Sequence, residues 1–154
     1  MLRLASYDIV FQEIPGEVTL ALNISGCPNG CPGCHSPHLQ EDAGEALDEA
    51  MLGELLDSYG STVTCVCFMG GDANPHEVQK LSVFIREATE RKLKTGWYSG
   101  RQSVPEELDI SNFDFIKLGP YIEKSGGLKS PDTNQRFYKI ESGIMVDITE
   151  IFQA

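Results

Sequence analysis

The stretch Val18–Cys34, VTLALNISGCPNGCPGC, joins an apolar segment to a compact loop rich in cysteine, glycine and proline. Its first seven residues, Val18–Ile24, are largely apolar and lie between Pro15-Gly16 and Ser25-Gly26, so they predict a buried strand. The loop Gly26–Pro37 carries three prolines and three glycines, a composition that excludes both helix and strand.

Patterns typical of strands and helices alternate after this loop. A nearly continuous apolar segment predicts a buried strand at Ser61–Met69. We interpret Lys94–Ser99 as a third core strand and Phe113–Leu118 as a fourth strand. Apolar residues at helical spacing predict two amphipathic helices, one over Glu45–Tyr59 and one that follows an N-cap at Asn74. A short helix at Pro105–Leu108 and a hairpin over Arg136–Phe152, turning at Ser142-Gly143, complete the predicted elements.

The alternation of strands and helices implies right-handed β-α-β crossovers and a mostly parallel sheet. The chain has 154 residues, whereas a complete eightfold β/α barrel needs roughly 250. We therefore predict an α/β fold, a short incomplete β/α barrel that is open on one side, in a single domain spanning residues 1–154. Ligands bind at the carboxyl ends of strands in such sheets, where the chain places the cysteine loop, Gly70-Gly71-Asp72, Ser99-Gly100 and Gly119-Pro120.

Charge and hydropathy exclude several classes of partner. The chain has 23 acidic and 12 basic residues and a formal charge of −11, which repels phosphate backbones, so we expect no binding to nucleic acid. No apolar run approaches the roughly 18 residues of a membrane helix, and Met1–Val10 lacks the core of a signal peptide. We therefore expect a soluble, cytoplasmic protein that does not bind membranes.

The five cysteines form two groups. An odd number without a secretory signal argues against a disulfide framework. Cys65 and Cys67 alternate within an apolar segment, so we interpret them as buried small hydrophobic residues that share one face. Cys27, Cys31 and Cys34 fall within eight residues and have the spacing C-x3-C-x2-C, which indicates metal chemistry.

Three thiolates on one compact loop can hold three corners of a cubane iron–sulfur cluster, which leaves one iron open to a non-protein ligand. Two alternatives stay open. A structural zinc site could use the same three cysteines and His38, although such sites usually take ligand pairs from separate segments. A redox pair of Cys31 and Cys34 would leave Cys27 unexplained.

The C-x3-C-x2-C loop after a first strand resembles the signature of the radical S-adenosylmethionine superfamily. Within it, most of the chain resembles the activating proteins of anaerobic (class III) ribonucleoside-triphosphate reductase. The motifs that carry this resemblance are Ser25-Gly26-Cys27, Cys31-Pro32-Gly33-Cys34, Gly70-Gly71-Asp72, Tyr98-Ser99-Gly100, Lys117-Leu118-Gly119-Pro120-Tyr121 and Thr133-Asn134-Gln135-Arg136. The sequence departs from the pattern at His35, where an aromatic residue is common, and at Ala73-Asn74, which separate Asp72 from Pro75.

The resemblance implies an oxidoreductase whose [4Fe-4S] cluster is held by Cys27, Cys31 and Cys34. After reduction by a donor such as flavodoxin or ferredoxin, cleavage of S-adenosylmethionine would give a 5′-deoxyadenosyl radical, which generates a glycyl radical on the reductase. The candidate cofactor-binding residues are His35, Gly70, Gly71, Asp72, Ser99 and Gly100, with no catalytic residue beyond the cluster ligands. The alternatives are an activase of another glycyl-radical enzyme and a non-catalytic zinc-bound interaction domain.

One long connection remains in the predicted fold, over residues 119–135. Loops of this length in compact domains are often functional. We hypothesise that this loop helps to dock the reductase or to close over the cofactor.

Overall fold

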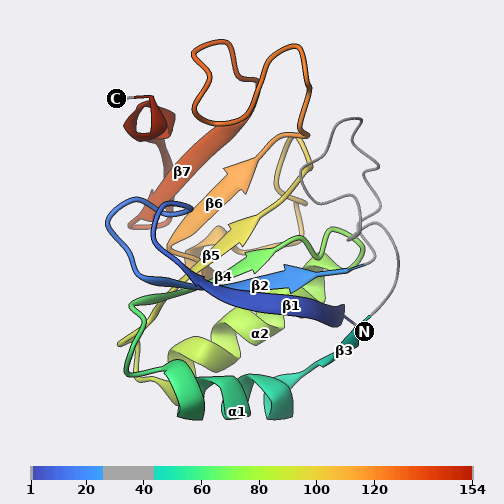
Figure 1. Ribbon diagram of the computed structural model, residues 1–154, viewed down its shortest axis with the longest axis vertical. Coiled ribbons are helices and arrows are strands. Elements are labelled where there is room, and N and C mark those ends of the chain that lie inside the picture. The colour runs from blue at the N-terminus through green and yellow to red at the C-terminus, as the bar shows by residue number, and fades with distance from the viewer. Residues whose placement is uncertain (1, 26–43, 154) are drawn as a thin grey trace.

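The computed structural model describes residues 2–25 and 44–153, which form one eight-stranded sheet with two α-helices on one face (Figure 1). The order of the strands in the sheet is β3-β1-β2-β4-β5-β6-β7-β8. The strands are β1 (Leu2–Val10), β2 (Thr19–Ile24), β3 (Glu45–Leu47), β4 (Cys65–Met69), β5 (Lys94–Tyr98), β6 (Phe115–Leu118), β7 (Arg136–Glu141) and β8 (Ile144–Asp147). The helices are α1 (Glu49–Tyr59) and α2 (Pro75–Ala88), with short 3-10 helices η2 (Ile110–Asn112) and η3 (Thr149–Phe152).

The middle of the sheet is parallel and its two sides are antiparallel. Three pairings are parallel, β2 with β4, β4 with β5 and β5 with β6. Four are antiparallel, β1 with β2, β1 with β3, β6 with β7 and β7 with β8. The prediction of a mostly parallel sheet in an open β/α barrel is therefore wrong. The described residues form a mixed sheet in which antiparallel pairings are the majority.

Three local differences account for the wrong fold class. The sequence predicts no strand in the first ten residues, yet they contain β1, which pairs with both β2 and β3. Glu45–Leu47 is a strand rather than the first turn of a helix, and α1 begins only after its N-cap Asp48. Residues 105–108 form a turn, so a 3-10 helix is the only regular helix in the described connection between β5 and β6.

Other predicted elements are confirmed. The helix after Asn74 begins at Pro75, and the Asn74 side chain accepts a hydrogen bond from the backbone N–H of Glu77 at 3.3 Å. The C-terminal hairpin turns at Ser142 and Gly143 as predicted, and both have positive φ angles, 52° and 77°. The left-handed backbone at these two positions matches the tight turn that joins β7 to β8. The hairpin ends at Asp147, however, because Thr149–Phe152 forms the 3-10 helix η3 rather than part of the hairpin.

Both faces of β4 are buried, as expected for a central parallel strand. Val66 and Phe68 belong to the larger apolar cluster, which includes core residues of α1 and α2. Cys65 and Cys67 alternate with them and belong to a second cluster on the other face of the sheet. The sheet therefore separates two apolar layers, of which the helices cover only one.

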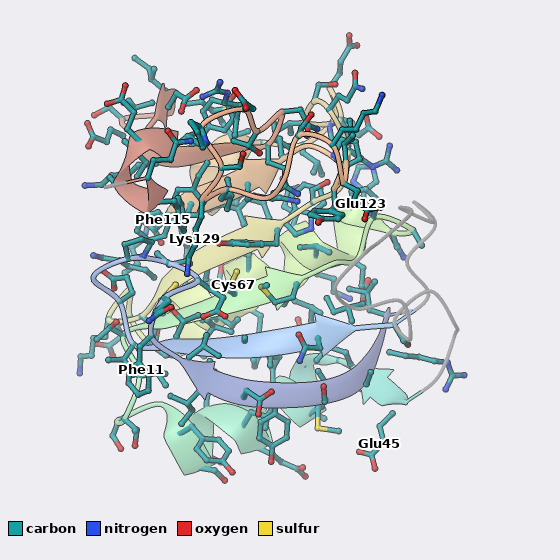
Figure 2. The ribbon with its side chains drawn as sticks, turned by 45° about the horizontal axis from the view of Figure 1, so that its top comes forward. Phe11, Glu45, Cys67, Phe115, Glu123 and Lys129 are labelled. Carbon is teal, nitrogen blue, oxygen red and sulfur yellow. The ribbon has the colours of Figure 1, made fainter. Side chains whose placement is uncertain are left out.

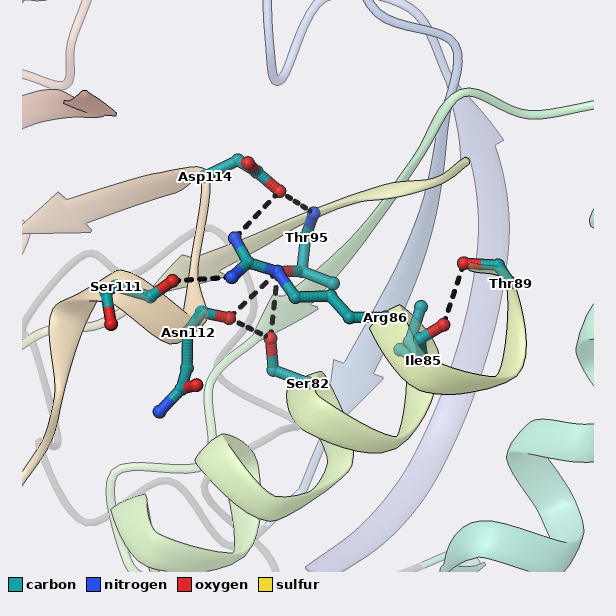
Figure 3. A network of polar contacts seen from close by, with 8 residues as sticks. All are labelled: Ser82, Ile85, Arg86, Thr89, Thr95, Ser111, Asn112 and Asp114. Carbon is teal, nitrogen blue, oxygen red and sulfur yellow. Dashed lines mark hydrogen bonds and ion pairs between the residues drawn. The ribbon is translucent and has the colours of Figure 1, made fainter. Parts of the chain in front are cut away.

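A polar network fastens α2 to β5 and to the start of β6 (Figure 3). The Arg86 guanidinium lies 3.1 Å from the Asp114 carboxylate, which also accepts a hydrogen bond from the backbone N–H of Thr95 at 2.9 Å. The Ser82 hydroxyl donates to the Asn112 carbonyl at 2.6 Å. These bonds satisfy polar groups that the packing of α2 removes from water.

We expect Arg86→Ala to lower the free energy of unfolding by about 2 kcal/mol, because it leaves Asp114 without its charged partner. The side chains of Arg86 and Asp114 are 10% and 34% exposed, so water compensates part of the loss at Asp114. Reversible urea denaturation measures the change. Lys139→Ala is the control, since Lys139 and Glu141 form an exposed pair and should contribute less than about 0.5 kcal/mol. Equal losses in the two variants would contradict the prediction.

Candidate functional site

Four of the predicted site residues, Cys27, Cys31, Cys34 and His35, lie outside the described residues. The same is true of His38, the alternative zinc ligand. The roles assigned to these side chains stay predictions. The described part of the candidate site begins where β2 ends, at Ile24 and Ser25.

The structure brings the other predicted site residues together at the carboxyl ends of β4 and β5. The Asp72 carboxylate joins these two ends, because it accepts a hydrogen bond from the Ser99 hydroxyl at 2.6 Å and one from the backbone N–H of Gly100 at 2.8 Å. Asp72 is 1% exposed and Ser99 is fully buried. Their proximity follows from the parallel pairing of β4 with β5, whereas their contact with a cofactor stays a prediction.

Gly70 and Gly71 give the end of β4 a backbone that other residues rarely adopt, with φ angles of 112° and 91°. A Cβ atom at Gly71 would lie 2.6 Å from the Val78 side chain, and one at Gly70 would lie 3.2 Å from the Ile24 carbonyl oxygen. The Trp97 indole donates a hydrogen bond to the Gly70 carbonyl at 2.8 Å. The glycines therefore allow β4 to end in close contact with α2 and with the last residue of β2.

The contacts of Asp72 favour a role in orienting the loops over direct recognition of a ligand amino group. Each carboxylate oxygen accepts a bond from the β5 end, and the Asp72 carbonyl accepts a bond from the Arg101 guanidinium at 2.8 Å. The backbone N–H of Arg101 donates in turn to the Ser99 hydroxyl at 3.0 Å. Asp72 thus fixes the positions of two neighbouring loops at one edge of the sheet.

Neither Lys117 nor Arg101 is among the predicted site residues, although Lys117 belongs to one of the motifs that carry the resemblance. The structure places both at the same edge of the sheet. Lys117 is 8% exposed, and its ammonium donates to the carbonyls of Ser99 and Gly119 at 3.1 and 2.8 Å. A lysine inside the apolar segment FDFIKL is the signal that could have identified it, because lysine is rarely buried without partners. Arg101 thus contacts Asp72 directly, and Lys117 contacts Ser99, the hydrogen-bond partner of Asp72, in a chain whose formal charge is −11.

The family model that matches the chain is described as a 4Fe-4S single cluster domain, and it matches residues 15–115. The chain belongs to this family. It is an iron–sulfur protein that binds a [4Fe-4S] cluster. The match includes the C-x3-C-x2-C motif and the residues Asp72, Ser99, Gly100 and Arg101, whereas Lys117 lies beyond it. No curated protein and no solved structure matches the chain.

The two remaining cysteines of this iron–sulfur domain are buried, as predicted. Cys65 and Cys67 are both fully buried free thiols, and they pack with Ile14, Phe115 and Phe137. Cys67 and Phe115 are labelled in Figure 2. Burial raises the pKa of both thiols well above its ordinary value. Neutral thiols are poor metal ligands because the thiolate is the coordinating form.

We expect Cys65 and Cys67 to resist alkylation at pH 8 in the folded iron–sulfur domain and to react once it is unfolded. Unfolded thiols ionise near pH 8.5, whereas the folded ones stay protonated above that pH because their pKa values are raised. The contribution of these raised pKa values to the free energy of unfolding is therefore fully present below about pH 8.5 and decreases as the pH rises further. Mass spectrometry of the peptide that contains both cysteines measures the reaction, and rapid alkylation without unfolding would contradict the prediction.

Across residues 2–25 and 44–153, no three His, Cys, Asp or Glu side chains lie together in a group that could hold a metal ion. In the same part of the iron–sulfur domain, no helix is both long and apolar enough to cross a membrane.

The connection between β6 and β7 is tied together by its own hydrogen bonds (Figure 1). Thr133 donates to the Gly126 carbonyl at 3.2 Å, and the Asn134 side chain donates to the Pro120 carbonyl at 2.9 Å. An isolated bridge also pairs Ile122 with Gly126. The hypothesis that this segment docks a partner or closes over a cofactor stays untested.

Proposed function

We propose that this iron–sulfur domain is a radical S-adenosylmethionine activase that generates a glycyl radical on an anaerobic ribonucleoside-triphosphate reductase. The observation that carries the proposal is the spacing Cys27-x3-Cys31-x2-Cys34 in a chain of the 4Fe-4S single cluster family. Three thiolates leave one iron of a cubane without a protein ligand. That iron is then available to the amino and carboxylate groups of S-adenosylmethionine.

The donor set of the chain fits such a cluster. Cys65 and Cys67 are buried with raised pKa values, and the described residues hold no group suited to a metal. Of the five cysteines, this leaves Cys27, Cys31 and Cys34 as the thiolates for the cluster. Soft thiolate ligands are the ones that iron–sulfur clusters take in proteins.

The polar edge of the sheet supports a binding site for S-adenosylmethionine next to this segment. β2 runs parallel to β4, so the cysteine segment leaves the sheet at the edge where Gly70, Gly71 and Asp72 lie. When bound, the cluster supplies the electron that cleaves the carbon–sulfur bond of S-adenosylmethionine. Asp72 holds the loops after β4 and β5 in place, and the cations Lys117 and Arg101 would favour an approaching carboxylate.

Anaerobic reconstitution followed by two assays tests the proposal. The first assay measures iron, sulfide and the methionine released from S-adenosylmethionine after reduction with flavodoxin or dithionite. We expect about four irons per chain and release of methionine that depends on the reductant. A chain with a full cluster that releases no methionine would contradict the proposal and indicate an electron-transfer protein.

The second assay identifies the protein substrate. The reduced activase is mixed with S-adenosylmethionine and the candidate reductase, and electron paramagnetic resonance detects the glycyl radical. We expect the radical on the anaerobic ribonucleoside-triphosphate reductase. A radical only on a different glycyl-radical enzyme would instead support the alternative activase, with the same chemistry and another partner.

A further inference from the structure

β1 lies in the sheet between the two strands that flank the segment with the three clustered cysteines (Figure 1). β2 ends at Ile24, before residues 26–43, and β3 begins at Glu45, after them. Leu4 of β1 is the register partner of both Ile24 and Glu45. The two ends of the cysteine segment are therefore paired to the same point of β1.

Arg3, the neighbour of Leu4, bonds to both ends of this segment. Its carbonyl accepts a hydrogen bond from the backbone N–H of Ser25 at 3.0 Å and one from the Ser25 hydroxyl at 3.4 Å. Its guanidinium donates to the Gly44 carbonyl at 3.2 Å. Through its main chain and its side chain, Arg3 thus connects Ser25, the last described residue before the segment, to Gly44, the first described residue after it.

Gly44 lies so close to β1 that no other residue fits without movement. Its φ angle is 106°, and a Cβ atom there would lie 2.2 Å from the Leu4 carbonyl oxygen and 3.0 Å from the Ala5 Cα. The register between β1 and β2 shifts between Leu4 and Ser6, as in a β-bulge, a feature that is common next to functional sites.

We propose that Arg3 is a positioning residue for the cluster: it holds the ends of the cysteine segment together and so slows the loss of the cluster. A segment whose ends are already joined loses less conformational entropy when its thiolates bind a cluster. The inference goes beyond the proposed function. It rests on the assignment of the cluster to Cys27, Cys31 and Cys34, and it does not require activase activity.

Release of iron to a chelator under anaerobic conditions tests this role in the reconstituted chain. We expect Arg3→Ala to release iron about three- to tenfold faster, the effect of losing one hydrogen bond from a charged donor. Arg3→Lys keeps a charged donor and should restore much of the retention. Arg136→Ala removes an arginine from β7, where it faces Asp147 at 3.8 Å, and should release iron at the wild-type rate.

Gly44→Ala tests the same contact between β1 and the end of the cysteine segment. It should release iron faster than Arg3→Ala, because the new methyl group meets the β1 backbone. Gly16→Ala is its matched control, since Gly16 also has a positive φ, 85°, but has open space around its Cβ position. If Gly44→Ala does not fold, the comparison of Arg3→Ala with Arg136→Ala decides, because neither places an atom against the backbone.

A second readout separates positioning from general destabilisation. Arg86→Ala weakens the distant contact of α2 with Asp114, and urea unfolding of the apoprotein measures how much stability each variant has lost. Faster iron release in Arg3→Ala than in Arg86→Ala, despite a smaller loss of stability, supports the proposal. The proposal is wrong if the rate of iron release depends only on the stability of each variant, or if Arg3→Ala releases iron at the wild-type rate. If the variants differ in iron release as expected but the reductase acquires no glycyl radical, only the proposed function is wrong.

Discussion

Cys31→Ala should lose its cubane cluster and more than about 100-fold of its rate of S-adenosylmethionine cleavage. Replacing even an outer partner of a metal ligand costs roughly 10- to 100-fold in affinity or activity, so removal of a ligand costs more. Cys31 is the middle of the three clustered cysteines, and the two thiolates that remain cannot hold three corners of a cubane. Iron and sulfide per chain and methionine release measure the two losses.

Cys65→Ala is the matched control, because it removes a cysteine from the same chain without touching the proposed ligands. Cys65 is fully buried in the second apolar cluster, so this variant should lose some stability and keep the full cluster. A Cys31→Ala chain that still cleaves S-adenosylmethionine reductively would refute the ligand assignment. Loss of the cluster in Cys65→Ala as well would place the cluster elsewhere in the chain.

The prediction that Asp72, Ser99 and Gly100 lie together succeeded because it depends on a simple geometric rule. Parallel strands carry their carboxyl ends to one edge. The sequence predicts both strands, β4 from its nearly continuous apolar segment and β5 as a core strand over Lys94–Ser99. The hydrogen bonds from Ser99 and Gly100 to Asp72 follow from the pairing of those strands. Their contact with a cofactor is a separate claim that this geometry does not test.

The antiparallel sides of the sheet were harder to predict, because their pairing depends on contacts between distant residues. Glu45, Ala46 and Leu47 are good helix formers, yet they pair with β1 as the strand β3. β1 itself buries Leu2 and Leu4 and then exposes four residues in succession. Its alternation of buried and exposed residues is therefore too short to predict a strand from the sequence. Tertiary pairing overrides local preference in these two strands.

The role of Arg3 illustrates the same limit. Its hydrogen-bond partners Ser25 and Gly44 are 22 and 41 residues away in sequence, and no local pattern relates them. Lys117 differs, because its position within an apolar strand is visible in the sequence, although its carbonyl partners are not. Charged residues that interrupt apolar strands are therefore signals that sequence analysis can use.

Asp72→Ala should lower the free energy of unfolding by about 2–4 kcal/mol, since it deprives two largely buried donors of their acceptor. The Ser99 hydroxyl and the Gly100 N–H both donate to this carboxylate, and Ser99 is fully buried. Urea denaturation measures the loss. Asp48→Ala, which removes the exposed N-cap of α1, should cost only about 1 kcal/mol.

The same substitution tests whether this edge of the sheet binds S-adenosylmethionine. Without Asp72, the loops after β4 and β5 lose the group that joins them, so we expect the dissociation constant to rise at least about tenfold, as for loss of a partner that orients a binding site. Asp48→Ala should bind S-adenosylmethionine as the wild type does, even though it is also less stable. Equal affinity in Asp72→Ala and the wild type would mean that the cofactor binds away from this edge. The cysteine segment could then still hold its cluster, because its ends are joined through β1 rather than through Asp72.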